Sequence, residues 1–297
     1  MRCLLIGLAL LASAAAYVEV NLGYHEKIGI PHAAEIKAAE DAIMAELSET
    51  EKQRAVDPLI VGGIVSTNAA HPFLGGLLIN LLSGGLSACG SSLISQNRAV
   101  TAAHCWFDGW NQAWQFTIAL GTNMLFYGGT RIATSQVVLH PQWNTATLAN
   151  DVAVIYLPQN VWYSNTIQPI ALPSSSQLWE TFVGEWAVAA GYGKTNDAQT
   201  GVSTNSVISH VNIQVISVAQ CQAVFGSWAL ASNICTNGAG GVGICSGDSG
   251  GPLYINRWGQ NILVGISSFV AAAGCQLGHP SAFARVTSFH SFITQNM

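Results

Sequence analysis

Charged side chains are scarce in this chain. Only 8% of its 297 residues are Asp, Glu, Lys or Arg, and the formal net charge is −5. The sequence has no cluster of Lys and Arg, which excludes the basic surface that nucleic-acid-binding proteins use. Half of the residues are hydrophobic, far too many for a disordered chain. The composition therefore predicts a folded protein that does not bind nucleic acid.

Apolar runs long enough to cross a membrane are missing too. The run at residues 3–12 follows Met1 and Arg2 and is well short of the ~20 apolar residues that span a bilayer. Small residues at Ala14 and Ala16 suit cleavage, so we expect residues 1–16 to be a secretory signal and not a membrane anchor. The sequence thus predicts a secreted, extracellular protein without a membrane partner.

The C-x-x-C spacing of many metal sites is absent, although the chain has seven cysteines. Cys3 would leave with the signal, and an even number remains. An even number of cysteines in a secreted chain predicts disulfides, and composition alone leaves fifteen pairings open. We expect no metal and no cofactor. The six remaining cysteines are Cys89, Cys105, Cys221, Cys235, Cys245 and Cys275.

Composition changes near Ile60. Residues 17–59 hold nine of the fifteen acidic residues and no cysteine. Apolar residues recur at helical spacing between residues 33 and 52, and Pro31 is placed to precede or start that helix. We interpret residues 17–59 as a partly helical segment that is separable from the main domain. The alternative is an N-terminal arm of the mature fold.

Short β-type runs dominate from residue 60 onward. Many such runs at roughly even spacing predict an all-β barrel or sandwich, and only residues 286–295 have a helix-like pattern. The 238 residues from 60 to 297 suffice to bury two cores. The predicted strands are residues 77–82, 91–94, 114–120, 136–139, 151–157, 186–190, 206–215 and 261–267.

Three separate positions combine into a candidate catalytic set. Ser249 lies in the run Gly247-Asp248-Ser249-Gly250, where glycines let the backbone approach a substrate closely. A serine hydroxyl needs a base to take its proton, and His104 supplies an imidazole that exchanges protons near neutral pH. Asp151 supplies a carboxylate that would fix the imidazole tautomer. Taken singly, the three are equally compatible with a turn, a packed histidine and a strand cap.

Together, these motifs resemble the chymotrypsin-like (trypsin-type, S1) serine endopeptidases. The chain order His, Asp, Ser is that of the family, and the resemblance extends from Ile60 to about Gln295. It implies two antiparallel six-stranded β-barrels, at about residues 60–173 and 174–297, followed by a C-terminal helix. The matching motifs are Ile60-Val61-Gly62-Gly63, Thr101-Ala102-Ala103-His104-Cys105, Asn150-Asp151-Val152-Ala153-Val154 and Gly247-Asp248-Ser249-Gly250-Gly251-Pro252-Leu253.

The resemblance also implies roles and partners. The enzyme would be a monomer that hydrolyses protein and peptide substrates through an acyl-enzyme, and that protein inhibitors could bind. The amides of Gly247 and Ser249 would form the oxyanion hole. The implied disulfides are Cys89–Cys105, Cys221–Cys235 and Cys245–Cys275.

Activation is implied by the same family. The new N-terminus, Ile60, would fold inward after cleavage and pair with Asp248, which makes residues 17–59 a propeptide. The residue before Ile60 is Leu59, where family members usually carry Arg or Lys. We therefore expect an activating protease that cuts after Leu59, with a cut after Arg54 as the alternative.

The resemblance places a substrate pocket around five residues. Gly243 would form the floor, and without an acidic group there nothing binds a substrate Arg or Lys. Ser268, Phe269, Val270 and Ser281 would form the walls. Because relatives that accept aromatic residues usually have glycine at the positions of Val270 and Ser281, we expect a preference for small or medium apolar residues. Large aromatic residues are the alternative.

A digestive setting is the leading interpretation. Residues 24–31 look like the prosegment of insect, especially moth-larva, midgut chymotrypsin-like enzymes, and from Ile60 onward the chain has one lysine and four arginines. These features predict a gut-lumen enzyme. The alternatives are a non-catalytic serine-protease homologue that binds partners and an enzyme of a proteolytic cascade. The remaining histidines, His71, His140, His210 and His279 among them, are expected at turns or on the surface.

Overall fold

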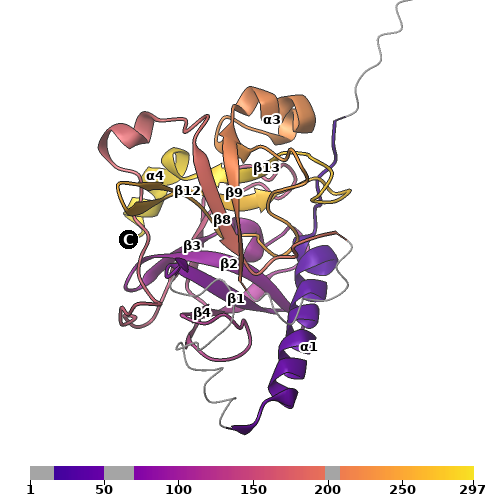
Figure 1. The fold of residues 1–297 in the computed structure, drawn as a ribbon, viewed down its shortest axis with the longest axis vertical. Coiled ribbons are helices and arrows are strands. Elements are labelled where there is room, and N and C mark those ends of the chain that lie inside the picture. Colours follow the sequence, from indigo (N-terminus) through magenta and orange to yellow (C-terminus); the bar gives the residue numbers. More distant parts are fainter. Residues whose placement is uncertain (1–16, 50–69, 198–207) are drawn as a thin grey trace, which may run out of the picture.

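The computed structural model describes residues 17–49, 70–197 and 208–297 (Figure 1). Two β units form the body of the molecule, one from the purple half of the chain and one from the orange and yellow half. The predicted signal at residues 1–16 lies outside the described residues, as do Arg54, Leu59 and Ile60.

The first unit is a sheet of seven antiparallel strands in the order β5-β4-β1-β2-β3-β7-β6. Its core holds Leu77, Ile79, Phe116, Ile118 and Val154, all fully buried. The strands pair in sequence from β5 to β6 and the two edge strands do not pair with each other, so this sheet is not a closed barrel. The family resemblance implied a closed barrel of six strands here. The strands are β1 (Leu74–Leu81), β2 (Leu86–Ser95), β3 (Arg98–Thr101), β4 (Ala113–Leu120), β5 (Thr130–Thr134), β6 (Val137–Leu139) and β7 (Ala153–Tyr156).

The second unit is a closed six-stranded barrel in the order β10-β13-β12-β11-β8-β9, as predicted. Inward-facing Ile213, Val215, Ile234, Val264 and Phe283 fill it. Alternation along β9 places Ile213 and Val215 inside and their neighbours outside, which is the period of a half-buried strand. The strands are β8 (Trp186–Gly191), β9 (Ser209–Ile216), β10 (Asn233–Thr236), β11 (Pro252–Arg257), β12 (Gln260–Phe269) and β13 (Ser281–Arg285).

Three α-helices complete the described fold. The C-terminal helix α4 (Val286–Gln295) has the predicted bounds and buries Phe289 and Ile293. Helix α3 (Val218–Phe225) begins with a capping box between Ser217 and Gln220. Helix α1 (Ile30–Glu46) belongs to the N-terminal region and follows a π-helix at His25–Gly29. Short 3-10 helices lie at Ala103–Cys105, Ser175–Trp179 and Gly226–Trp228.

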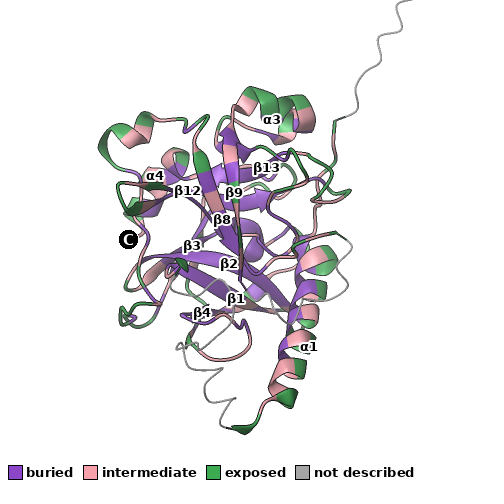
Figure 2. Cartoon of the chain, in the orientation of Figure 1, coloured by how far each residue is buried: buried purple, intermediate pink, exposed green. Residues whose placement is uncertain are grey.

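Residues 17–49, called the N-terminal segment below, pack against both units, with α1 on the first sheet and residues 18–22 on the second unit. Figure 1 shows α1 running along the side of the molecule, and Figure 2 shows buried residues on α1 beside exposed ones. Ala33 and Ile36 of α1 are almost fully buried against Leu74 and Leu125. The helix predicted at residues 33–52 thus begins earlier and, within the described residues, ends at Glu46.

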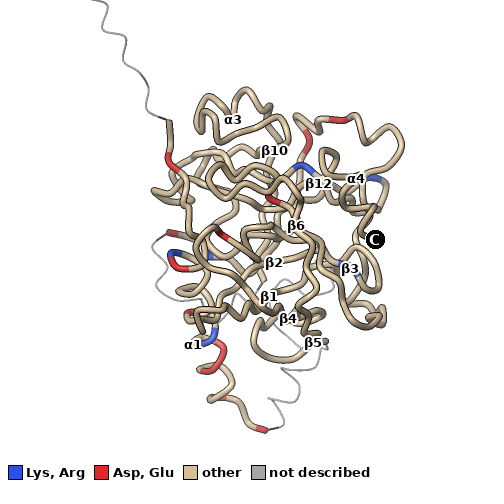
Figure 3. The backbone as a smooth tube through the Cα atoms, turned by 180° about the vertical axis from the view of Figure 1, so that it is seen from behind, with Lys and Arg blue, Asp and Glu red and all other residues tan. Residues whose placement is uncertain are grey.

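The all-β fold class with a C-terminal helix is confirmed. The three implied disulfides are present, and they close separations of 16, 14 and 30 residues. Figure 3 shows how thinly charge is spread over the chain, with several charged residues on and near α1. Within the described residues, every helix is too short or too polar to cross a membrane.

Candidate active site

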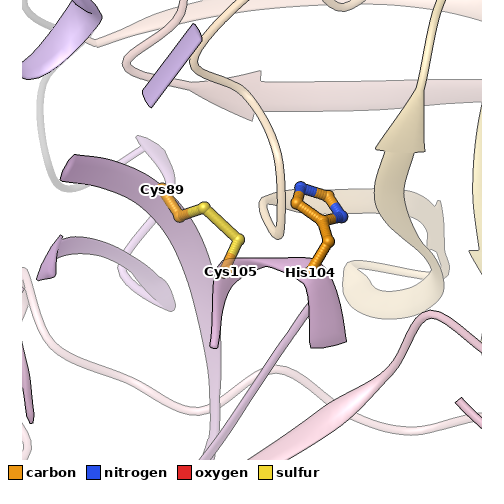
Figure 4. Close-up of side chains that lie close together, drawn as sticks. All are labelled: Cys89, His104 and Cys105. Carbon is orange, nitrogen blue, oxygen red and sulfur yellow. A yellow bond between two sulfur atoms is a disulfide. The ribbon is translucent and has the colours of Figure 1, made fainter. Parts of the chain in front are cut away.

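His104 is held by the end of one strand and a disulfide. Strand β3 ends at Thr101, and His104 follows in the 3-10 helix at Ala103–Cys105. Cys105 is bonded to Cys89 of β2, so the turn that carries His104 is covalently tied to the sheet (Figure 4). The imidazole is only 3% exposed. The end of β3 and the disulfide together fix the backbone position from which the His104 side chain extends.

Asp151 binds His104 twice. Its Oδ2 lies 2.7 Å from Nδ1 of His104, and its Oδ1 accepts the backbone N–H of His104 at 2.9 Å. Asp151 is 1% exposed and lies two residues before β7, after Asn150 at φ +62°. A buried carboxylate on Nδ1 leaves Nε2 as the nitrogen that can exchange a proton with a reacting group.

Ser268 provides a third donor to the same carboxylate. Its Oγ donates to Oδ2 of Asp151 over 2.7 Å, from near the end of β12 in the second unit. The sequence identified Ser268 only as a pocket wall, and the bond to Asp151 was missed. Nothing in the local sequence signals it, because the two residues are 117 positions apart.

Ser249 lies in the loop before β11, pressed against the loop of His104. Gly90 of β2 donates its N–H to the carbonyl of Ser249 at 2.7 Å. A Cβ at Gly250, which has φ +80°, would lie 2.1 Å from Oγ1 of Thr101 and 2.4 Å from the carbonyl oxygen of Gly90. Only glycine permits this approach, so Gly250 lets the serine loop of one unit close onto the histidine loop of the other.

The side chain of Tyr24, from the N-terminal segment, reaches the same place. Its ring centroid lies 4.7 Å from that of His104, and its hydroxyl donates to the carbonyl of Ala88 at 2.7 Å. Burial raises the pKa of Tyr24 well above its usual range, while a hydrogen bond with Ser249 acts in the opposite direction and the charge of Asp248 adds to the rise. Among the described residues, none hydrogen-bonds to Nε2 of His104. No motif in the sequence indicated that Tyr24 would lie here.

Asp248 is buried beside the loop and accepts two backbone N–H groups. Gly193 donates to Oδ1 and Cys245 to Oδ2, both at 2.9 Å. Burial raises the pKa of Asp248 to about 6, although both hydrogen bonds oppose the rise. A cavity of about 220 Å³ adjoins this carboxyl group. The proposed partner, Ile60, lies outside the described residues.

The predicted pocket residues fall into two groups. Ser268, Phe269 and Val270 line a cavity of about 40 Å³ together with His104 and Ser249. The N-terminal segment also lines this cavity, through residues 21–24 and Ile28. Gly243 and Ser281 lie against one another, since a Cβ at Gly243 would meet the Ser281 hydroxyl at 2.6 Å. Gly243 lines the separate cavity beside Asp248, so the structure does not bring Gly243 and Ser281 into the cavity of Ser268, Phe269 and Val270.

Gly247, one of the two predicted oxyanion residues, lies against the N-terminal segment. It has φ +99°, and a Cβ there would lie 2.1 Å from Nε2 of His32. The other residue, Ser249, contacts Tyr24 as described above. Both predicted oxyanion residues are thus next to the segment and not open to solvent on that side.

Two clusters contain possible metal ligands within the described residues, and both depend on disulfide sulfurs. One is Cys89, His104 and Cys105, and the other contains Asp197 with the Cys245–Cys275 pair. A metal would need thiolates, and these sulfurs are bonded to each other. His71, expected at the surface, is instead 4% exposed, because its Nδ1 pairs with the hydroxyl of Tyr254 at 3.0 Å.

A sequence model described as Trypsin matches residues 60–293. The chain belongs to the trypsin family of serine proteases. Collagenase of Hypoderma lineatum is 35% identical to this trypsin-family chain over 239 residues, covering 80% of this chain and 86% of the relative. Brachyurin of Leptuca pugilator is 37% identical over 237 residues, covering 79% and 96%.

Further comparisons agree with the trypsin-family assignment. Serine protease 1 of Drosophila melanogaster is 34% identical over 240 residues, covering 80% of this chain and 85% of the relative. A solved structure of HL collagenase superposes with a TM-score of 0.70 at 33% identity, covering 80% of this chain and 98% of that chain. The matched portion leaves out the N-terminal segment, because the family model begins at residue 60.

Proposed function

We propose that this trypsin-family chain is a secreted serine endopeptidase that is made as a zymogen. The observation that carries the proposal is the buried pair of His104 and Asp151, with 2.7 Å between Nδ1 and Oδ2, next to the loop of Ser249. A nucleophile, a base and a carboxylate that orients the base are the minimum set for acyl transfer by serine.

Each residue has a distinct role in the proposed reaction. Ser249 Oγ attacks the peptide carbonyl while Nε2 of His104 takes its proton and then returns it to the leaving amine. Asp151 keeps the imidazole in the required tautomer and stabilises its charged form. The amides of Gly247 and Ser249 bind the oxyanion, and losing one such donor costs roughly 10²–10³ in rate.

Activation requires a cut that the sequence places after Leu59. In the uncut chain, the buried Asp248 has only backbone donors around it, which leaves its charge without a cationic partner among the described residues. The amino group of Ile60 would supply that partner. N-terminal sequencing of active enzyme tests the position of the cut, and an active form that starts at Ala55 would contradict it.

Substrate preference is proposed to be small or medium apolar residues before the scissile bond. Val270 lines the cavity beside Ser249, so its side chain takes up space there, and the Ser281 hydroxyl lies against Gly243, the proposed floor. Rates on Ala, Leu, Phe and Arg peptides measure the preference. A Phe rate tenfold above those of Ala and Leu would favour the aromatic alternative, since tenfold is about 1.4 kcal/mol of discrimination.

The central test is hydrolysis by the activated enzyme and its loss on substitution. Ser249→Ala should lower kcat by about 10⁶, as in other serine proteases where binding and oxyanion contacts alone remain. Ser92→Ala is a suitable control, because the Ser92 hydroxyl is buried without a hydrogen-bond partner among the described residues. Full-length activated chain that folds and hydrolyses no peptide would identify a non-catalytic homologue. A digestive role in the gut lumen is proposed on the sequence resemblance alone.

A further inference from the structure

We propose that the N-terminal segment, residues 17–49, is an inhibitor that binds along the substrate cleft of this chain and acts in trans as well as in cis. The inference rests on the proposed peptidase function, because inhibition requires an activity to inhibit. It assigns a function to a part of the chain that the trypsin-family match does not cover.

The segment enters the cleft as an extended strand. Val20 forms an antiparallel bridge with Ala271, and Ala272 donates its N–H to the carbonyl of Glu19 at 2.8 Å. Side chains at alternate positions, Val18, Val20 and Leu22, pack on the apolar cluster that contains Phe269. Main-chain pairing with alternate side chains in apolar contact is how proteins bind extended peptides. The segment therefore takes the course of a substrate beside the pocket wall.

Tyr24 then occupies space next to the nucleophile and its base, since all three line one cavity. Its hydroxyl donates its proton to the carbonyl of Ala88, so the phenol has no proton left to give to Ser249 or His104. The same ring lies 4.7 Å from the imidazole of His104, whose Nε2 has no hydrogen-bond partner among the described residues. With Tyr24 bound, its side chain takes the space beside Ser249 and His104 that a substrate peptide needs.

The backbone at Tyr24 explains why the segment blocks the site without being a substrate. Tyr24 has φ −53° and ψ −47°, and the chain continues as the π-helix His25–Gly29 and then α1. In a helix, the backbone N–H and C=O groups hydrogen-bond to one another within the helix. The segment is extended only up to the catalytic residues, and beyond them it presents no extended bond to Ser249.

Beyond Tyr24, two histidines anchor the segment on the other side of the site. The N–H of His25 donates to Asp108 at 2.8 Å, and its Nδ1 lies 2.9 Å from Oγ of Ser87. His32 places Nε2 2.9 Å from the carbonyl of Tyr192. Both imidazoles are at most 1% exposed, so these contacts are fully removed from water.

Helix α1 adds charge-assisted contacts that a passing peptide would lack. Glu40 accepts the N–H groups of Leu125 and Phe126 at 2.6 and 2.8 Å and is 2% exposed. Lys194 lies 2.9 Å from a carboxylate oxygen of Glu35. Such bonds are short and directional, so they fix the register in which Tyr24 reaches the site.

The test is steady-state kinetics with a synthetic peptide of residues 17–49. Full-length chain is activated by cleavage, freed of the segment by gel filtration in denaturant followed by refolding, and assayed on a small peptide substrate with increasing peptide. We expect competitive inhibition, with KM raised and kcat unchanged, and intact peptide by mass spectrometry after the assay. Noncompetitive inhibition, no inhibition, or rapid cleavage next to Tyr24 would overturn the inference.

Three peptide variants make the test specific. Tyr24→Ala should weaken inhibition by about thirtyfold, the size of an interface hot spot. Gly29→Ala should also weaken it by at least tenfold, because a Cβ there would lie 2.0 Å from Oγ of Ser87. Alanine favours helix over glycine, so a peptide that acted only through its helicity would improve. Glu26→Ala, at an exposed neighbouring position, is the matched control and should inhibit like the parent peptide.

Failure of this inference and failure of the proposed function give different results. If refolded enzyme hydrolyses substrate and the peptide does not inhibit, the inference alone fails. If the enzyme hydrolyses nothing, calorimetry of the same four peptides with that protein still decides the inference. Loss of binding in Tyr24→Ala and Gly29→Ala, with Glu26→Ala unchanged, supports it, and four equal affinities or no binding overturn it.

Discussion

Ser268 donates a hydrogen bond to Asp151 across the two units of the fold. The 2.7 Å bond ends on Oδ2, the same oxygen that binds Nδ1 of His104. The carboxylate is therefore restrained from both sides, by β12 of the barrel and by the histidine loop of the sheet. A donor on this oxygen fixes the direction in which Asp151 holds the imidazole.

Removing that donor should slow the reaction without unfolding the protein. A hydrogen bond to a charged group is worth about 1.5–3 kcal/mol, so Ser268→Ala should lower kcat/KM by about tenfold or more. The pH profile of kcat/KM should also change on its acid side, because Asp151 then holds the imidazolium differently. Ser92→Ala is the control for a lost buried hydroxyl. Equal kcat/KM in the Ser268→Ala variant and the parent would rule out this positioning role.

Enlarging the pocket at Val270 should change substrate preference. Val270 lines the cavity next to Ser249 and Phe269. We expect Val270→Gly to raise the ratio of Phe to Ala rates by about tenfold, because one or two methylene-sized groups of pocket space are worth ~1–3 kcal/mol. Val183→Gly, at an exposed position in the second unit, serves as the control. An unchanged ratio would show that Val270 does not limit the pocket.

Asp248 should make the uncut chain less stable as pH rises. Its folded pKa, about 6, lies above its ordinary value of 3.8 because burial disfavours the charged form. Its contribution to stability is therefore present below pH ~4 and is lost as pH rises through about 6, a change of about 3 kcal/mol. Because buried histidines gain stability over the same range, the test is the difference from Asp248→Asn: between pH 4 and 7 the unfolding free energy of the uncut parent, measured in urea, should change by about 3 kcal/mol less favourably than that of the variant. An identical pH dependence in both proteins would contradict the shift.

Acid should release the N-terminal segment. Burial lowers the pKa of His25 and of His32 to about 4, so their contribution to binding is full above about 6.5 and is lost as pH falls toward 4. His25 faces Asp108 and His104, and His32 faces Glu35 and Lys194. We expect the affinity of the peptide for the Ser249→Ala protein to fall at least tenfold from pH 7 to pH 5.

Two further measurements define the pH window of the segment. A His25→Asn peptide should lose less affinity at pH 5, since it has one titrating group fewer. Glu40 acts with the opposite sign, because burial raises its pKa to about 7 and its contribution is lost as pH rises through that value. Binding should thus be tightest between about pH 6 and 7. Affinity that is flat from pH 5 to 9 would refute both assignments.

Helical periodicity predicted the C-terminal helix, and the family resemblance implied the closed second barrel and the disulfide pairs. The sequence pattern missed the strands β3, β5, β10, β11 and β13. These have four to six residues each. Runs this short contain too few alternations to show a clear period, and β11 begins within the nucleophile motif that ends at Leu253. Their pairing partners decide their structure.

The contacts of Ser268 and Tyr24 could not be predicted for a different reason. Both depend on distances through space between residues far apart in the chain, 117 positions for Ser268 and Asp151. The catalytic motifs contain the residues that carry out the reaction. Ser268 and Tyr24 restrain or cover those residues, so the catalytic motifs do not include them. The segment before Ile60 was expected to be separable, and its helical pattern alone did not indicate which surface it would cover.

Residues 17–49 lie before the cut predicted after Leu59, and their contacts with the residues after it are noncovalent. Cleavage there breaks no hydrogen bond described above, so the cut chain begins as a complex of two polypeptides. Activity then depends on total concentration, because the released piece rebinds in a crowded compartment and departs on dilution. The cut enzyme would be inhibited by the released segment while it is stored at high concentration. It would become active once it is secreted and diluted, because the segment then dissociates.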